Sequence, residues 1–191
     1  KGTSFRSMFS GTHVFNQPIS SWDVSKGTDF SYMFNSALKF NQDLNGWDLS
    51  LNTKFRSMFS NAYKFNGNIS EWNVSKGTDF DGMFAGAEMF NQDVGGWDMS
   101  SGTDLGSMFS GADMFNQDIG GWNVSSVTDF SYMFSDAMNF DKNIGNWDVS
   151  KGTNFSKMFL MADVFNQDIG GWNVSSGTNF SYMFKETDKF D

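Results

Sequence analysis

Apolar residues recur at helical spacing in one half of a segment that the chain repeats. Between residues 27 and 40 the apolar positions are Phe30, Met33, Phe34, Ala37 and Phe40. Steps of three and four residues place such side chains on one face of a short helix. A threonine precedes this stripe in every copy, where its hydroxyl can cap a helix N-terminus. The threonines are Thr3, Thr28, Thr53, Thr78, Thr103, Thr128, Thr153 and Thr178.

The other half of the segment alternates apolar and polar residues. Trp47 and Leu49 alternate with small or polar neighbours, and Leu44 precedes Trp47 by three residues. Alternation of this kind predicts a strand with one buried face, and the spacing matches the start of a leucine-rich repeat. The equivalent triplets are Ile19-Trp22-Val24, Ile69-Trp72-Val74, Val94-Trp97-Met99, Ile119-Trp122-Val124, Ile144-Trp147-Val149 and Ile169-Trp172-Val174.

The tryptophans set the period of the whole chain. They recur every 25 residues without insertion, as Trp22, Trp47, Trp72, Trp97, Trp122, Trp147 and Trp172. A fixed period of this length predicts stacked repeats. The predicted fold class is an α/β repeat: a leucine-rich-repeat-like, right-handed solenoid with a parallel β-sheet on one side and short helical segments on the other. We expect residues 1–191 to form a single solenoid of about seven and a half repeats. Neither end shows a polar capping repeat, which is expected of a fragment or of a unit that stacks end to end.

Composition narrows the classes of partner. The chain has 13 basic and 22 acidic residues, a net charge of -9 and no cysteine. This balance argues against nucleic acid, whose phosphates require clustered Lys and Arg, and against anionic lipid. Without cysteine there is neither a disulfide framework nor a thiolate metal site. The apolar runs are too short to span a bilayer, so we expect no membrane insertion within this segment.

The string from Phe115 to Phe134, which contains Asn116-Gln117-Asp118-Ile119, Trp122 and Val124-Ser125, resembles the BspA-like leucine-rich repeat surface proteins. That resemblance covers essentially the whole chain. It implies an extracellular or surface-anchored protein used for adhesion or interaction, with no catalytic residues. The chain departs from the family where glycine mostly replaces the valine before the threonine, and where phenylalanine replaces a methionine. We expect these glycines to loosen the turn or to adopt a positive φ.

Strand positions that face away from the core should form an exposed sheet face, and this face is the candidate binding or packing surface. One column holds Asp23, Asp48, Asn73, Asp98, Asn123, Asp148 and Asn173, and beside it runs a column of serines, Ser25, Ser50, Ser75, Ser100, Ser125, Ser150 and Ser175. The face lacks the Trp, Tyr and Arg anchors of protein hot spots. It therefore favours a repetitive ligand, a broad weak surface or lateral packing.

The sequence raises two further questions about that face: calcium binding and glycosylation. Stacked aspartates could hold calcium, a cation that prefers carboxylate and amide oxygens. We prefer a solvated acidic face, so no metal site or cofactor is assigned. N-x-Ser sequons begin at Asn68, Asn73, Asn123, Asn154, Asn173 and Asn179. They are glycosylation sites only in a secreted protein, and three of them arise from the repeat itself.

Two functions from different classes remain open. The first is a non-enzymatic protein, extracellular or at the cell surface, that mediates adhesion or recognition by binding a protein or glycan surface. The alternative is a structural subunit of an extracellular fibre that self-associates by end-to-end or lateral stacking. Catalysis is not expected, because carboxylates repeat in every copy whereas an active site needs one asymmetric cluster. The one histidine, His13, stands in a variable column. A column of asparagines before each predicted strand is expected to bond to backbone groups at a corner.

Overall fold

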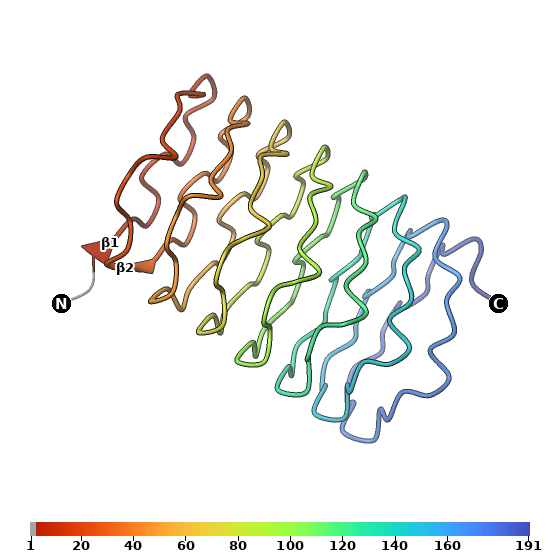
Figure 1. Ribbon diagram of the computed structural model, residues 1–191. Coiled ribbons are helices and arrows are strands. Elements are labelled where there is room, and N and C mark those ends of the chain that lie inside the picture. The colour runs from red at the N-terminus through yellow and green to blue at the C-terminus, as the bar shows by residue number, and fades with distance from the viewer. Residues whose placement is uncertain (1–2) are drawn as a thin grey trace.

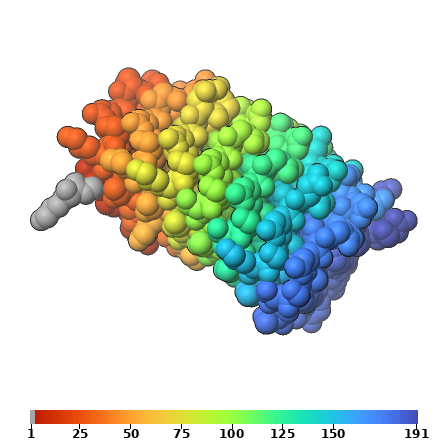
Figure 2. All heavy atoms as spheres, turned by 60° about the horizontal axis from the view of Figure 1, so that its bottom comes forward, coloured from red at the N-terminus to blue at the C-terminus, as the bar shows by residue number. Residues whose placement is uncertain are grey.

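The computed structural model describes residues 3–191, and in it each repeat forms one coil. The coils stand side by side from the N-terminal to the C-terminal end (Figure 1). On the surface of the stack they follow one another as successive bands (Figure 2). Residues 25 apart in sequence therefore become neighbours: the rings of Phe65 and Phe90 are 6.0 Å apart, and those of Phe90 and Phe115 are 5.9 Å apart. The 25-residue period of the sequence is the period of the structure.

Strand structure is limited to a narrow parallel ladder. β1 (Thr3–Ser4) pairs in parallel with β2 (Gly27–Asp29), with Thr3 opposite Gly27 and Ser4 opposite Asp29. In the later coils the ladder continues as single bridges. These join Asp29, Lys54, Asp79, Asp104, Asp129, Asn154 and Asn179 in that order. The ladder thus follows the threonine column and lies away from the tryptophans.

The predicted strand at each tryptophan is wrong. At Trp47 the backbone N–H donates to the carbonyl of Leu44 at 3.0 Å, and the N–H of Asn52 donates to that of Leu49 at 2.8 Å. Local turns therefore occupy the N–H groups that a ladder between coils would need. The coils are joined here by the indole instead, because Trp47 Nε1 donates to the carbonyl of Ile19 at 3.0 Å.

The predicted helix is also wrong, and residues 3–191 contain no helix. Tyr32 and Ser36 have φ values of 60° and 57°, in the left-handed region that a right-handed helix excludes. Each is the third residue of a four-residue β-turn: Met33 N donates to Phe30 O at 3.1 Å, and Ala37 N donates to Phe34 O at 2.9 Å. Two consecutive turns of this kind produce the spacing of apolar residues from which the sequence predicts a helix.

Alternate N–H groups in these turns connect neighbouring coils. Tyr32 N donates to Arg56 O at 2.9 Å, and Phe34 N donates to Met58 O at 2.8 Å. The threonine hydroxyl caps no helix; Thr78 Oγ1 donates to the carbonyl of Thr53 at 3.2 Å. The leucine-rich-repeat-like α/β fold class is therefore wrong, because hydrogen bonds between turns replace both the helix and the sheet.

The core consists of the aromatic and methionine columns, as the pattern predicts. Phe34 and Met33 are fully buried, and Trp47 is 3 % exposed. The Trp47 and Trp72 rings are 6.4 Å apart and almost parallel, at 2°. Offset stacks of this kind add to the free energy gained by burial. The prediction that the large apolar columns form the core is confirmed.

The asparagine column forms the predicted ladder at a corner of each coil. Its side-chain Oδ1 atoms accept hydrogen bonds from the backbone N–H one coil later, as between Asn41 Oδ1 and Asn66 N at 2.8 Å. Asp141 fills one place in the column and serves equally, accepting from Asn166 N at 3.0 Å. The acceptor oxygen is thus the feature that the corner requires, and this prediction is confirmed.

The glycines before the threonines have a different role from the one expected. Gly27 and Gly77 are not among the residues with positive φ. A Cβ at Gly27 would lie 2.3 Å from Phe30 Cε2, and one at Gly77 would lie 2.4 Å from Phe80 Cζ. The ring three residues later fills the space of the missing side chain. At Gly27 and Gly77 the two departures from the resembled family, glycine for valine and phenylalanine for methionine, therefore lie in direct packing contact.

Candidate functional site

The Asp/Asn column expected on the sheet face instead forms a turn at one edge of the coils. We call this column with its serines the Asx edge. Its seven Asp and Asn side chains are all exposed. In each coil the Oδ1 atom accepts the backbone N–H two residues later, for example from Ser50 to Asp48 at 3.0 Å and from Ser75 to Asn73 at 3.1 Å. This is an Asx turn, which Asp and Asn favour.

The serines of the Asx edge orient these side chains. Ser75 Oγ donates to Asn73 Oδ1 at 2.7 Å, and Ser125 makes the same bond to Asn123. Except for Ser175, which is exposed, the serines are half-buried rather than fully displayed. In every coil the edge therefore presents an Asp or Asn side chain that is held at least by the backbone N–H of its serine.

Hydrogen bonds from the serines also fix the charge of the Asx edge. They lower the pKa of the Asp23, Asp48, Asp98 and Asp148 carboxyls below the ordinary value of an aspartic acid. Hydrogen bonds to the charged form have this effect because they favour the anion. The four aspartates are consequently ionised at neutral pH, while Asn73, Asn123 and Asn173 interrupt the row of charges.

The sequons fall into two structural groups. Asn73, Asn123, Asn173 and Asn179 are exposed, whereas Asn68 and Asn154 are half-buried. Asn154 also uses its amide nitrogen, since Nδ2 donates to Asp129 Oδ2 at 3.2 Å. If the protein is glycosylated, the exposed group is the accessible one.

Within residues 3–191, no three or more histidine, aspartate or glutamate side chains gather closely enough to hold a metal ion. The calcium alternative for the Asp column stays an untested expectation. Across the same residues there is no helix of the length and apolarity needed to cross a membrane.

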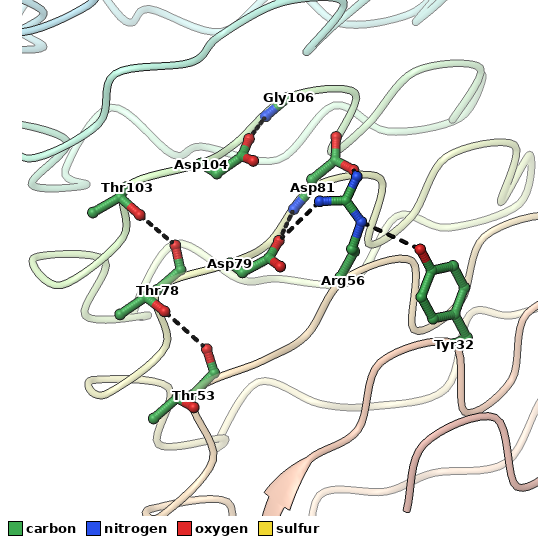
Figure 3. Close-up of polar contacts among 9 residues, drawn as sticks. All are labelled: Tyr32, Thr53, Arg56, Thr78, Asp79, Asp81, Thr103, Asp104 and Gly106. Atoms are coloured by element: carbon green, nitrogen blue, oxygen red, sulfur yellow. Dashed lines mark hydrogen bonds and ion pairs between the residues drawn. The ribbon is translucent and has the colours of Figure 1, made fainter.

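Sequence reasoning missed an acidic cluster beside the ladder. Arg56 lies at its centre, with Nη2 2.6 Å from Asp81 Oδ2, Nη1 3.8 Å from Asp79 Oδ1, and Nε donating to Tyr32 Oη at 3.2 Å (Figure 3). Asp104 lies one coil further on and accepts the N–H of Gly106 at 3.0 Å. The Arg56 guanidinium thus contacts the carboxylates of Asp79 and Asp81, and its positive charge also acts on the more distant Asp104.

A family model described as "Mycoplasma protein of unknown function, DUF285" matches residues 1–97, 47–141 and 78–191. The chain belongs to this family. The three overlapping matches support the repeat, but the expected membership of the BspA-like leucine-rich repeat family is wrong, because the matching family is DUF285. The leucine-rich assignment also lacks the helices on which it depended. No curated protein and no solved structure matches the chain.

In this DUF285 chain the acidic cluster cannot be recognised from the sequence, because its members come from different coils. Most of its members lie about one period apart, and only Asp79 and Asp81 are close in the sequence, so no local motif connects the whole cluster. The usable signal is the run of Asp79, Asp104 and Asp129 in one column, with Asp81 and Arg56 in the column two places later. To predict the cluster from this signal, one would have to know that both columns lie beside the ladder.

The acidic cluster predicts an unusual dependence of stability on pH. Burial raises the pKa of Asp81 to about 6, and repulsion from neighbouring aspartates adds to this effect while Arg56 opposes it. Because the pKa is higher in the folded than in the unfolded chain, the folded state binds more protons between about pH 4 and 6. The melting temperature should therefore rise as pH falls from 7 towards 5. It should fall again below about pH 4, where the Asx-edge aspartates lose the stability linked to their lowered pKa values.

The variant Asp81→Asn should flatten the rise between pH 7 and 5 and raise the melting temperature at pH 7, since the amide oxygen still accepts from Arg56. Asp98→Asn is the matched control, because the pKa of Asp98 is lowered and Asn already occupies its column at Asn73. Thermal melts followed by circular dichroism at several pH values make the comparison. A parent curve that is flat between pH 5 and 7 would count against the raised pKa.

Proposed function

We propose that the chain is a non-enzymatic recognition scaffold that mediates adhesion at the cell surface or outside the cell. The Asx edge would bind a protein or glycan surface of repeating chemistry. One observation carries the proposal: an exposed Asp or Asn held by its serine recurs in seven consecutive coils. A regular array of equal groups suits a ligand that is itself regular.

The physical basis of such binding is multivalency. A single exposed Asp or Asn contributes little affinity, because water competes for its hydrogen bonds. Several equal contacts on one rigid stack raise the effective concentration of each later contact, so that avidity exceeds the affinity of any one. The serine hydrogen bonds reduce the entropy that the side chains lose on binding, since they already restrain the rotamers.

The chemistry of the edge limits the partner. It offers four carboxylates and three carboxamides, and no aromatic or arginine anchor stands in these columns. This favours hydroxyl, amide or cationic groups presented at intervals, rather than one deep apolar anchor. The extracellular setting belongs to the same proposal and stays an expectation from the sequence.

Glycines beside the Asx edge allow a direct test. A Cβ at Gly96 or Gly121 would meet nothing within 4 Å, and both residues are exposed. Tyrosines there should cover the edge without disturbing the coil. We expect the purified chain to bind members of a panel of immobilised glycans and surface-protein preparations. The double variant Gly96→Tyr, Gly121→Tyr should lose most of that binding.

The control is Lys54→Tyr, which adds the same side chain at an exposed ladder position. Binding that both variants retain equally would place the ligand elsewhere. If nothing on the panel is bound and electron micrographs show long filaments, the structural fibre becomes the better account.

A further inference from the structure

A second surface, separate from the Asx edge, carries exposed apolar side chains at one corner of the coils. We call it the corner ridge. Its members each occupy one of two adjacent repeat positions and occur once per coil. They are Val14, Leu38, Tyr63, Met89, Met114, Met138 and Val164. Tyr63, Met89, Met114 and Met138 are 41 to 47 % exposed, and only Leu38 is as much as half-buried.

The ridge runs from coil to coil. Met89 N donates to Tyr63 O at 3.3 Å, and Met114 N donates at 3.0 Å to the carbonyl of Glu88, the residue before Met89, so that these members lie on directly adjoining coils. The phenylalanine column just behind it advances by about 6 Å per coil, which makes the ridge from Val14 to Val164 about 36 Å long. Single exposed apolar residues are ordinary, but a contiguous row indicates a contact surface. Methionine suits such a surface because its flexible side chain adapts to a partner.

Charges divide the ridge into two halves. Lys39 and Lys64 flank the first half, whereas Glu88, Asp113 and Asp163 flank the second. Burial raises the pKa of Asp113, and repulsion from Glu88 and Asp136 adds to the rise. The acidic half therefore holds like charges close together, and lysines brought by a partner would relieve them.

We propose that the corner ridge is the interface of an antiparallel homodimer. A second copy of the chain offers an apolar row of the same spacing, with its charges in the reverse order. Two-fold symmetry about the coil of Met89 places Lys64 opposite the partner's Asp113, and Asp113 opposite the partner's Lys64. Such self-complementary pairing is the ordinary form of a symmetric dimer.

The size and charge of the ridge set the strength of the dimer. A stable interface commonly buries about 800 Å² on each partner, and the ridge is long but narrow. The two Glu88 side chains meet near the symmetry axis and repel each other. Both features point to a weak, concentration-dependent dimer. It forms whether or not the Asx edge binds a ligand.

Sedimentation equilibrium of the 191-residue chain tests the proposal. At concentrations up to about 200 µM, which populate even a weak dimer, the mass should approach twice the 21.5 kDa of the chain. The double variant Met89→Gln, Met114→Gln keeps charge and length while removing apolar surface, and it should weaken the dimer at least fivefold. Leu51→Gln is the control, since Leu51 is equally exposed at 45 % but lies off the ridge.

Charge exchange tests the orientation. Lys64→Asp alone and Asp113→Lys alone should each weaken the dimer, because each sets like charges face to face. An equimolar mixture of the two, or both changes in one chain, should restore it. A parallel dimer would gain nothing from the double change. Lys76→Asp, an exposed site off the ridge, controls for the change in net charge.

A chain that stays monomeric at every concentration would overturn the proposal, as would a dimer that the methionine changes leave intact. A dimer that those changes weaken, but that the charge exchange does not restore, would overturn the antiparallel arrangement. Thermal melts of each variant establish that it folds.

Discussion

Replacing Trp122 with alanine should lower the free energy of unfolding by roughly 3–5 kcal/mol. Trp122 is 4 % exposed, and its ring lies 6.4 Å from that of Trp147 and 6.2 Å from that of Phe109. Its Nε1 donates to Val94 O at 3.0 Å. The alanine variant therefore loses buried area, two aromatic contacts and one of the bonds that join neighbouring coils.

Two further variants separate these contributions. Trp122→Phe keeps a ring but removes the indole N–H, so it should cost less than the alanine change. Trp22→Ala is the matched control in the same column, because Trp22 is 37 % exposed and buries less area. Urea unfolding and thermal melts give the values. A loss of this size should move the melting temperature by more than about 5 °C in a chain of this length. A midpoint within about 2 °C of the parent would contradict the packing described for Trp122.

The variant Gly77→Val should destabilise the chain by about 1–3 kcal/mol, the usual cost of overpacking. A Cβ at Gly77 would lie 2.4 Å from Phe80 Cζ and 2.9 Å from Phe55 Cε2, so both rings must move. Val127 shows that the column can hold valine beside Phe130, so the cost reflects repacking rather than a forbidden backbone. Denaturant unfolding measures the loss.

The second change Phe80→Leu should recover part of that loss, because a smaller side chain frees the space. Gly102→Val supplies the comparison. Gly102 is followed by Leu105 in place of phenylalanine, and the nearest ring atom to its Cβ would be 3.7 Å away. Equal losses at Gly77 and Gly102, with no recovery in the double variant, would show that glycine and phenylalanine are not coupled.

Much of the fold could be predicted by comparing equivalent positions of the repeats, and little of it from the pattern within one repeat. The exact period, the buried columns around Trp122 and the asparagine ladder follow from the repeat, because equal residues one period apart must meet in a stack. The helix could not be distinguished from two consecutive four-residue turns, since both place Phe134 and Ala137 on one side. A warning was available at Gly82, Gly86 and Gly111, which interrupt that segment and have positive φ. The strand was mistaken because Asp48 between Trp47 and Leu49 forms an Asx turn.

The candidate site also has features that could be predicted from the sequence and features that could not. The exposure of the Asp/Asn column followed from alternation with buried neighbours, although the column lies on a turn and not on a sheet. The half-burial of Ser75 did not follow, because it depends on a bond to Asn73 that only the turn creates. The acidic cluster around Arg56 and the corner ridge around Met89 were both missed. The cluster depends on contacts between coils that no local motif shows, and the ridge occupies two adjacent columns in which charged and polar residues are interspersed with the apolar ones.

The central claim is that turns with positive φ, linked coil to coil, replace the helix and the sheet. Nuclear magnetic resonance of the assigned chain tests it most directly at Tyr132 and Asp136, whose φ values are 56° and 57°. We predict strong intraresidue amide–Hα contacts at both residues. Their amide protons should be protected from exchange by the bonds to Ser156 O and Leu160 O. An unbroken run of helical Cα chemical shifts from Phe130 to Phe140 would contradict the claim.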